Sequence, residues 1–188
     1  MTYAINVPYS GSRGRMHIRR AASMETRQYV DAAVRNRTLL ICAKVNNEVA
    51  SKAWDALVEA ARRAGLTNLI ALRVVLDRVL KNLDGLIKKA KLTADDTSEL
   101  GRVQKMYSSI WADPAKAAKR RKWASVKRLP PGSGPPAGAD HVILSTAAAL
   151  ASSNDVEFLT FDHDFIIFRE EILQELRVAV VNGYDLAR

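Results

Sequence analysis

The sequence has few residues of several kinds, and each scarcity excludes a class of protein. Its 188 residues include a single cysteine, Cys42, so neither a disulfide framework nor a cysteine-based zinc site can form. No apolar run approaches the roughly 18 residues that a membrane span requires. The N-terminus lacks the apolar core of a signal peptide. We therefore expect a cytoplasmic protein without a membrane partner. Cys42 lies in an apolar run, so we expect its thiol to be buried.

Charge is distributed unevenly along the chain. The net charge is +9, and 48% of the residues are hydrophobic, enough for one domain with a real core. Residues 62–128 contain 17 Lys and Arg against 6 Asp and Glu, whereas residues 129–188 contain 3 against 9. A basic middle attracts phosphates, and an acidic end suggests carboxylates held for a metal. Ordinary solvated helix faces are the alternative interpretation of the middle.

Segments with helical spacing alternate with short apolar strands, which indicates a parallel sheet covered on both faces. Residues 129–138 read LPPGSGPPAG and predict a loop, because prolines and glycines there exclude a regular element. Asp113 and Pro114 predict a break followed by a new helix. The expected strands are residues 2–7, 38–41, 156–161 and 178–181. The expected helices are residues 21–35, 45–64, 72–87, 100–111, a short piece that begins at Pro114, 139–153 and 165–176. Thr93 or Asp95 is expected to cap the helix at 100–111.

Three aspartates near the C-terminal end carry the chemistry. Asp140 opens a predicted helix, and Asp162 and Asp164 follow a buried strand, where open parallel sheets bind ligands. Converging carboxylates repel one another unless a divalent cation such as Mg²⁺ or Mn²⁺ lies between them. The alternative is a helix-capping Asp140 and two loop aspartates that never meet. We expect the neighbouring His141 and His163 to point away.

These residues resemble the motifs of PIN-domain nucleases. Asp140 followed by HVILSTAAAL looks like the third acidic motif of that family, and FLTFDHDF at 158–165 looks like the fourth. Leu176–Asn182 is similar to the strand that closes such domains. LLICAKVNNEV at 39–49 resembles the second strand and the helix with the family's characteristic acid, here Glu48.

The resemblance covers roughly residues 1–61 and 137–182. It implies an α/β fold for the whole of 1–188: a single three-layer α/β/α domain with a central parallel sheet of four or five strands. Residues 66–136, with their basic helices and Pro/Gly-rich loop, would be an inserted helical arm within that domain.

The resemblance also implies an activity, the metal-dependent endoribonuclease reaction. Asp140 and Asp162 would be the principal ligands of Mg²⁺ or Mn²⁺. Glu48 would bind a second metal or a metal-bound water, and Asp164 would be an outer ligand or an orienting residue. Thr160 would form a hydrogen bond with a neighbouring carboxylate.

Asn6 is the main departure from the family pattern. The family's first strand ends in Asp, whereas Tyr3-Ala4-Ile5 is followed here by Asn6, whose amide oxygen brings no charge to a catalytic position. The chain is either a natural variant with weakened catalysis or a nuclease silenced by an engineered Asp-to-Asn exchange. We favour the second explanation because the other acidic positions are intact.

The basic part of the middle segment is interpreted as a guide for an RNA backbone. An arm for oligomerisation or for a protein partner is the alternative. Trp111 and Trp123 flank the basic run and would serve as stacking platforms for bases or, more commonly, as core residues. The residues expected to contact phosphates are Lys116, Lys119, Arg120, Arg121, Lys122, Lys127 and Arg128.

The sequence is also compatible with two further functions. One is a catalytically inactive PIN module that binds RNA or a protein, and the other is a structure-specific DNA nuclease. An endoribonuclease of this family could be an RNA-processing enzyme or the toxin of a toxin–antitoxin pair. The expected partners are therefore RNA, with a second copy of the chain or an antitoxin as further candidates.

Overall fold

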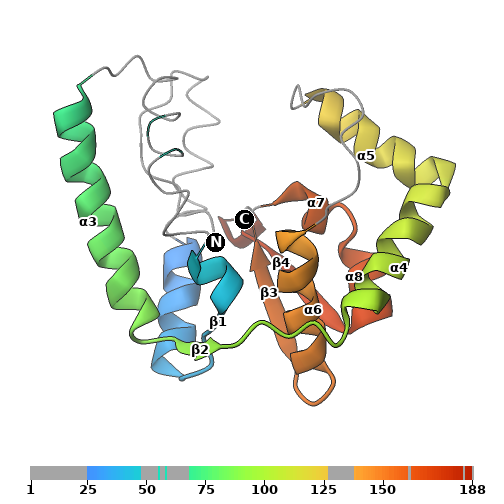
Figure 1. Ribbon diagram of the computed structural model, residues 1–188, viewed down its shortest axis with the longest axis horizontal. Coiled ribbons are helices and arrows are strands. Elements are labelled where there is room, and N and C mark those ends of the chain that lie inside the picture. The colour runs from blue at the N-terminus through green and yellow to red at the C-terminus, as the bar shows by residue number, and fades with distance from the viewer. Residues whose placement is uncertain are drawn as a thin grey trace. The chain divides into compact units, whose positions relative to one another are not determined.

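The computed structural model divides the chain into two units (Figure 1). The first unit comprises Met1–Ala94 with Gly183–Arg188, and the second comprises Asp95–Asn182. Each unit has its own pair of parallel strands. The structure describes residues 25–47, 55, 58, 68–126, 138–160, 162–183 and 185–187.

Two short parallel strands lie in the described part of the first unit. Ile41 in one strand is paired with Leu92 in the other, and Ile41 and Cys42 are buried. Asn68 caps the long helix α3, because its Oδ1 accepts a hydrogen bond from the N–H of Ala71 at 3.0 Å. In chain order the elements are a helix at residues 25–35, β1 (Leu40–Cys42), helical residues 43–47, α3 (Leu69–Ile87), β2 (Lys91–Thr93) and the 3-10 helix η1 (Asp185–Ala187).

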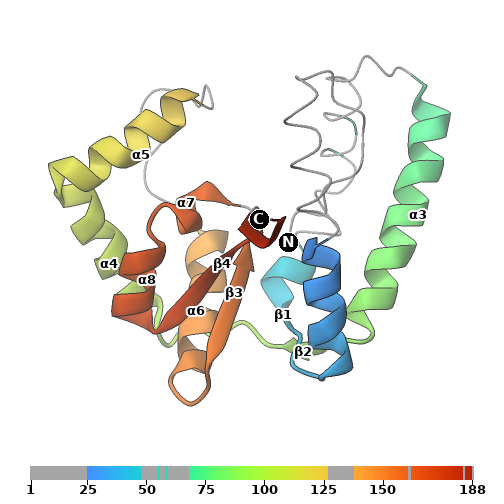
Figure 2. The ribbon, with the colours of Figure 1, turned by 180° about the vertical axis from the view of Figure 1, so that it is seen from behind.

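The second unit combines helices with a second parallel pair of strands. Val156 is paired with Val178 at one end of this pair and Thr160 with Asn182 at the other. Helix α6 lies in front of the two strands in Figure 1 and behind them in Figure 2, so it covers one face of the pair. The elements are α4 (Leu100–Ala112), α5 (Pro114–Val126), α6 (Ala139–Ala151), β3 (Val156–Thr160), α7 (His163–Ile166), α8 (Arg169–Leu176) and β4 (Val178–Asn182).

The core of the second unit forms where α4, α6 and α8 pack together beside the strands. Val103 and Tyr107 of α4 are spaced by four residues, so they lie on one face of that helix, and both are buried. They meet Leu144 of α6 and Ile172 of α8, each with 0% of its surface exposed. Each large apolar side chain buried in this way stabilises the fold by about 1.5–3 kcal/mol.

The junction between α4 and α5 follows the sequence prediction. Asp113 ends α4, and its Oδ1 accepts hydrogen bonds from the N–H groups of Ala115 at 2.9 Å and Lys116 at 3.3 Å. Pro114 occupies the first position of α5, where its missing N–H costs nothing. An N-cap aspartate and a following proline therefore start the helix that carries much of the basic run.

Most predicted elements of the second unit are confirmed, and its strands agree with a mixed α/β fold. The predicted helix 165–176 is wrong as a single element, because α7 ends at Ile166 and α8 begins at Arg169. The predicted cap at Thr93 or Asp95 is also wrong: Thr93 belongs to β2, and Glu99 precedes α4 without a side-chain cap. Strand β2 was not predicted from the sequence.

Several predictions lie wholly or partly outside the described residues. They include the strand at 2–7, most of the helix at 45–64 and the loop at 129–137. Within the span 66–136, assigned above to an inserted arm, α4 supplies four buried residues to the core of the second unit. Helix α3 of the same span belongs to the first unit.

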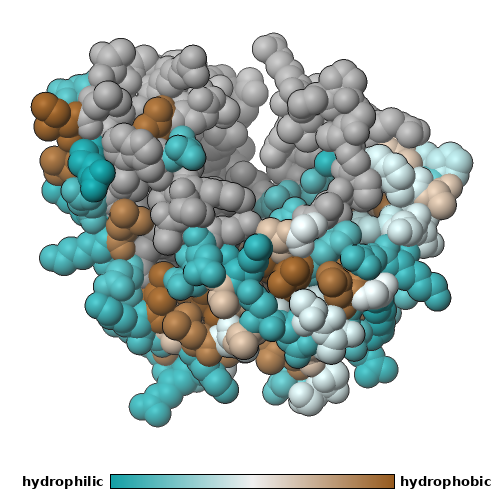
Figure 3. All heavy atoms as spheres, in the orientation of Figure 1, coloured by the Kyte–Doolittle hydropathy of each residue, from teal (hydrophilic) through white to brown (hydrophobic). Residues whose placement is uncertain are grey.

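The surface of the described residues is mainly polar but includes apolar side chains. Ile70 is 81% exposed, Val74 57% and Leu92 55%, and brown apolar patches interrupt the teal hydrophilic surface in Figure 3. Single exposed apolar residues are common and do not define an interface. Among the described residues, no helix is long and apolar enough to cross a membrane.

Candidate functional site

Two of the predicted acids lie in one turn at the C-terminal end of β3. Thr160 is the last residue of β3, and its Oγ1 accepts a hydrogen bond from the N–H of Asp162 at 2.9 Å. Oδ1 of Asp162 accepts a hydrogen bond from the N–H of Asp164, also at 2.9 Å. A side chain that bonds the backbone two residues ahead fixes a tight turn. Thr160 therefore supports the site through the backbone of Asp162.

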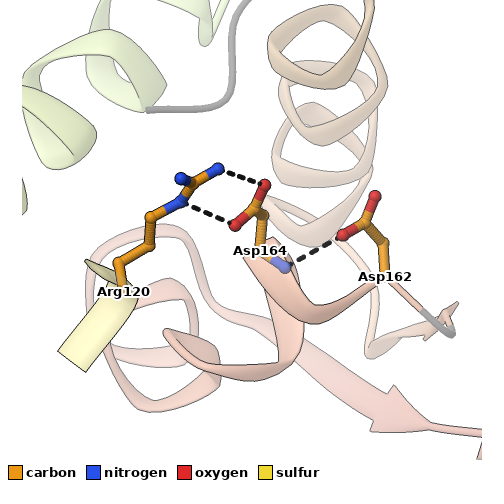
Figure 4. A network of polar contacts seen from close by, with 3 residues as sticks. All are labelled: Arg120, Asp162 and Asp164. Atoms are coloured by element: carbon orange, nitrogen blue, oxygen red, sulfur yellow. Dashed lines mark hydrogen bonds and ion pairs between the residues drawn. The ribbon is translucent and has the colours of Figure 1, made fainter. Parts of the chain in front are cut away.

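Asp164 is bound by an arginine from α5. Nε of Arg120 donates to Oδ1 of Asp164 at 2.9 Å, and Nη2 donates to Oδ2 at 3.0 Å (Figure 4). The Arg120 side chain is 5% exposed and the Asp164 side chain is 23% exposed. The pair is therefore partly shielded from water and has the two-pronged geometry that makes arginine–carboxylate pairs strong.

Asp140 lies in the first turn of α6, as predicted, and is half-buried. The next residue, His141, is 9% exposed, and its ring stacks on that of Tyr107 with centroids 5.3 Å apart and planes inclined by 11°. The imidazole thus packs against an aromatic ring of α4. The side chain of His163 is outside the described set.

Tyr107 links the three aspartates electrostatically. Burial raises the pKa of its phenol above the usual value near 10, and the negative charges of Asp164, Asp140 and Asp162 raise it further. A phenolate would be disfavoured both by the loss of water and by three like charges.

The hydroxyl of Tyr107 is buried and has no hydrogen-bond partner among the residues that the structure describes. An unpaired buried hydroxyl costs about 1–3 kcal/mol. Since its pKa is raised, it stays protonated and remains a donor at neutral pH. Tyr107 was missed by the sequence analysis as part of this site, since its apolar spacing on α4 indicated only a core role.

The described residues do not by themselves form a metal site. Among them, no group of three or more His, Cys, Asp or Glu side chains could hold a metal ion. Both oxygens of Asp164 accept hydrogen bonds from Arg120, and Oδ1 of Asp162 accepts one from the N–H of Asp164. The other two predicted site residues, Glu48 and Asn6, lie outside the described residues.

The basic residues predicted to contact phosphates have different surroundings. Nζ of Lys116 lies 3.3 Å from Oε1 of Glu171 in α8, and Arg120 is bound to Asp164, whereas Lys119 is exposed. Trp111 is half-buried, and the guanidinium of Arg120 lies 5.9 Å from the centre of its ring. The side chains of Arg121, Lys122 and Trp123, and all of Lys127 and Arg128, are outside the described set.

Comparison with known proteins found no similar protein. No family model matches the chain, and neither a curated protein nor a solved structure matches it.

Proposed function

We propose that the protein is a metal-dependent endoribonuclease related to PIN-domain nucleases. One observation carries the proposal: Asp162 and Asp164 lie in one turn at the C-terminal end of β3, and Asp140 lies in the first turn of α6, which packs against β3. Carboxylates gathered at the C-terminal end of a parallel strand are typical of a catalytic crevice. The motif resemblance supplies the reaction.

In this proposal Asp140 and Asp162, with Glu48 as the third donor, hold Mg²⁺ or Mn²⁺. The ion would lower the pKa of a bound water and offset negative charge on the phosphate. Asp164 has a supporting role because Arg120 occupies its oxygens. Thr160 holds the backbone of Asp162, and Asn6 leaves this chain with one carboxylate fewer than the family pattern.

The proposal includes the fold that the resemblance implies, a three-layer α/β/α domain with a central parallel sheet of four or five strands. Its support is that the two described strand pairs are both parallel. Parallel strands that are covered by helices on both faces belong to α/β folds of this type.

RNA cleavage by the full chain and by Asn6→Asp tests the proposal. We expect Asn6→Asp to cleave single-stranded RNA when Mn²⁺ is present and to stop when EDTA removes the metal. Asp162→Asn in the Asn6→Asp chain is the matched control, because the amide oxygen still accepts the N–H of Asp164 while the charge is lost. Cleavage that persists in that control, or that needs no metal, would contradict the assignment.

The binding-module alternative has one observation in its favour, the occupation of Asp164 by Arg120. It predicts that neither the chain nor Asn6→Asp cleaves RNA, while both bind it. A single-stranded DNA of the same sequence, assayed in parallel, identifies a DNA nuclease if it is cut in preference to the RNA.

Lys119→Gln tests whether α5 guides RNA toward the acids. Deletion of residues 113–136 would also remove Asp113 and Arg120, which have structural contacts, so a single exposed charge is the cleaner perturbation. If Lys119 contacts a phosphate, the slope of log affinity against log salt falls by about 0.7 for single-stranded RNA. An unchanged slope would exclude that contact.

A further inference from the structure

Arg120 is a cation with almost no access to water. The whole residue is 4% exposed, although arginine is among the residues that are almost never fully buried unless paired. Its guanidinium has Asp164 as a two-pronged partner and lies 5.9 Å from the ring centre of Trp111, a distance suited to a cation–π contact. A guanidinium engaged in this way is a poor candidate for binding an RNA backbone.

A continuous series of contacts runs from Arg120 to the end of β3. Arg120 binds the carboxylate of Asp164, and the N–H of Asp164 binds the carboxylate of Asp162 (Figure 4). The N–H of Asp162 in turn binds the hydroxyl of Thr160. Trp111 belongs to α4 and Arg120 to α5. The turn that carries both acids is therefore attached to two helices that come earlier in the sequence.

We propose that Arg120 is a positioning residue, which holds Asp164 and through it keeps the carboxylate of Asp162 in place to bind a divalent cation. This inference rests on the proposed function, because it concerns the same acids. It assigns Arg120 a role other than phosphate contact. Partners that orient a ligating carboxylate commonly change metal affinity by 10–100-fold when they are removed.

The direction in which Mn²⁺ affinity changes when Arg120 is replaced distinguishes a positioning role from a purely electrostatic one. Removing a nearby cation should strengthen Mn²⁺ binding if Arg120 acts only through its charge, because less repulsion opposes the metal. Loss of positioning should weaken binding. Arg120→Lys keeps the charge but loses the planar two-pronged geometry, so a positioning role predicts that lysine fails to restore affinity.

The experiment measures Mn²⁺ binding to the full Asn6→Asp chain by the paramagnetic resonance of free Mn²⁺. We expect Arg120→Gln to weaken binding about 10-fold or more and Arg120→Lys to weaken it nearly as much. Lys105→Gln removes the same charge from an exposed position of α4 and should change the affinity by less than about twofold, as expected for a screened surface charge. Unchanged or tighter binding by Arg120→Gln overturns the proposal.

A second measurement does not depend on metal. Hydrogen exchange of the Asp162 and Asp164 amides reports the two bonds of the turn directly, and we expect both to exchange at least about 10-fold faster in Arg120→Gln but not in Lys105→Gln. Amides of the β3–β4 pair should keep their protection, which excludes general unfolding as the cause. Unchanged exchange at the turn overturns the positioning role. Faster exchange in a chain that never binds Mn²⁺ leaves Arg120 as the anchor of the turn and refutes the proposed function instead.

Discussion

Replacing Tyr107 by phenylalanine tests the electrostatic environment of the acids by a measurement of stability. The phenol is 1% exposed, and its pKa is raised first by burial and then by the charges of Asp164, Asp140 and Asp162. In the unfolded chain the same phenol ionises near pH 10. The folded and unfolded states therefore bind different numbers of protons in alkaline solution.

The sign of the effect follows from that difference. Above pH 10 the unfolded state has lost the Tyr107 proton and the native state has kept it, so the free energy of unfolding falls as pH rises. The loss is about 0.4 kcal/mol at pH 10 and about 1.4 kcal/mol at pH 11, with a limiting slope of about 1.4 kcal/mol per pH unit. Below about pH 9 the contribution is fully present.

Urea unfolding of the chain and of Tyr107→Phe between pH 8 and 11, with EDTA present, measures this quantity. Groups that titrate equally in both proteins cancel in the difference between their free energies of unfolding. We expect the phenylalanine variant to gain about 1.4 kcal/mol relative to the parent between pH 8 and 11. At pH 8 it should be as stable as the parent or up to about 2 kcal/mol more stable, because the hydroxyl has no partner among the described residues. A difference that stays constant with pH would refute the argument.

Three further substitutions test the packing and capping of the second unit. Leu144→Ala removes a side chain with 0% exposure and should lower the free energy of unfolding by about 2–5 kcal/mol in urea titrations. Ser145→Ala should raise the melting temperature, with a gain of about 0.5–2 kcal/mol, because Oγ is buried without a hydrogen-bond partner in the described part of the chain; a loss would indicate a hidden partner. Asp113→Ala should cost about 1 kcal/mol in thermal melts followed by circular dichroism, and Asp113→Asn, which keeps the acceptor for the N–H of Ala115, should cost much less.

Regular elements with strong local signals could be predicted from the sequence. Helix α4 has apolar residues at helical spacing, and the start of α5 has an aspartate and a proline that act within one turn. Strand β2 has only three residues and follows Lys88 and Lys89, so no periodicity could develop. Its partner β1 lies 51 positions earlier by the pairing of Leu40 with Lys91, and that pairing decides its conformation.

The break between α7 and α8 could not be predicted because the helical spacing of apolar residues continues across it. Phe165, Phe168, Ile172 and Leu176 repeat at helical spacing and are all buried, so a single helix satisfies the pattern equally well. Phe168 precedes α8 with φ −109° and ψ 25°, outside the helical region. Spacing along the sequence identifies the face that is buried, but it does not show that the backbone changes direction beneath it.

Part of the candidate site could be predicted because each acid lies at the end of a recognisable element. Asp140 starts α6, and Asp162 follows β3. The partner of Asp164 could not be predicted, because Arg120 is 44 positions away and lies in a run of cations that look alike in the sequence. Only the folded chain shows which member of that run is buried.

Two helices of the protein end in an arginine where glycine is the more usual residue. Arg37, after the helix at 25–35, has φ 57°, and Arg177, after α8, has φ 60°. A left-handed conformation costs a side-chain-bearing residue about 1–2 kcal/mol, but a cation beside the negative end of a helix returns about 0.3–1 kcal/mol. Because β1 and β4 follow these two residues within a few positions, each arginine ends a helix just before a strand and can add a positive charge near the helix's negative end. Salt should therefore weaken both helix ends, whereas glycine ends would be insensitive to it.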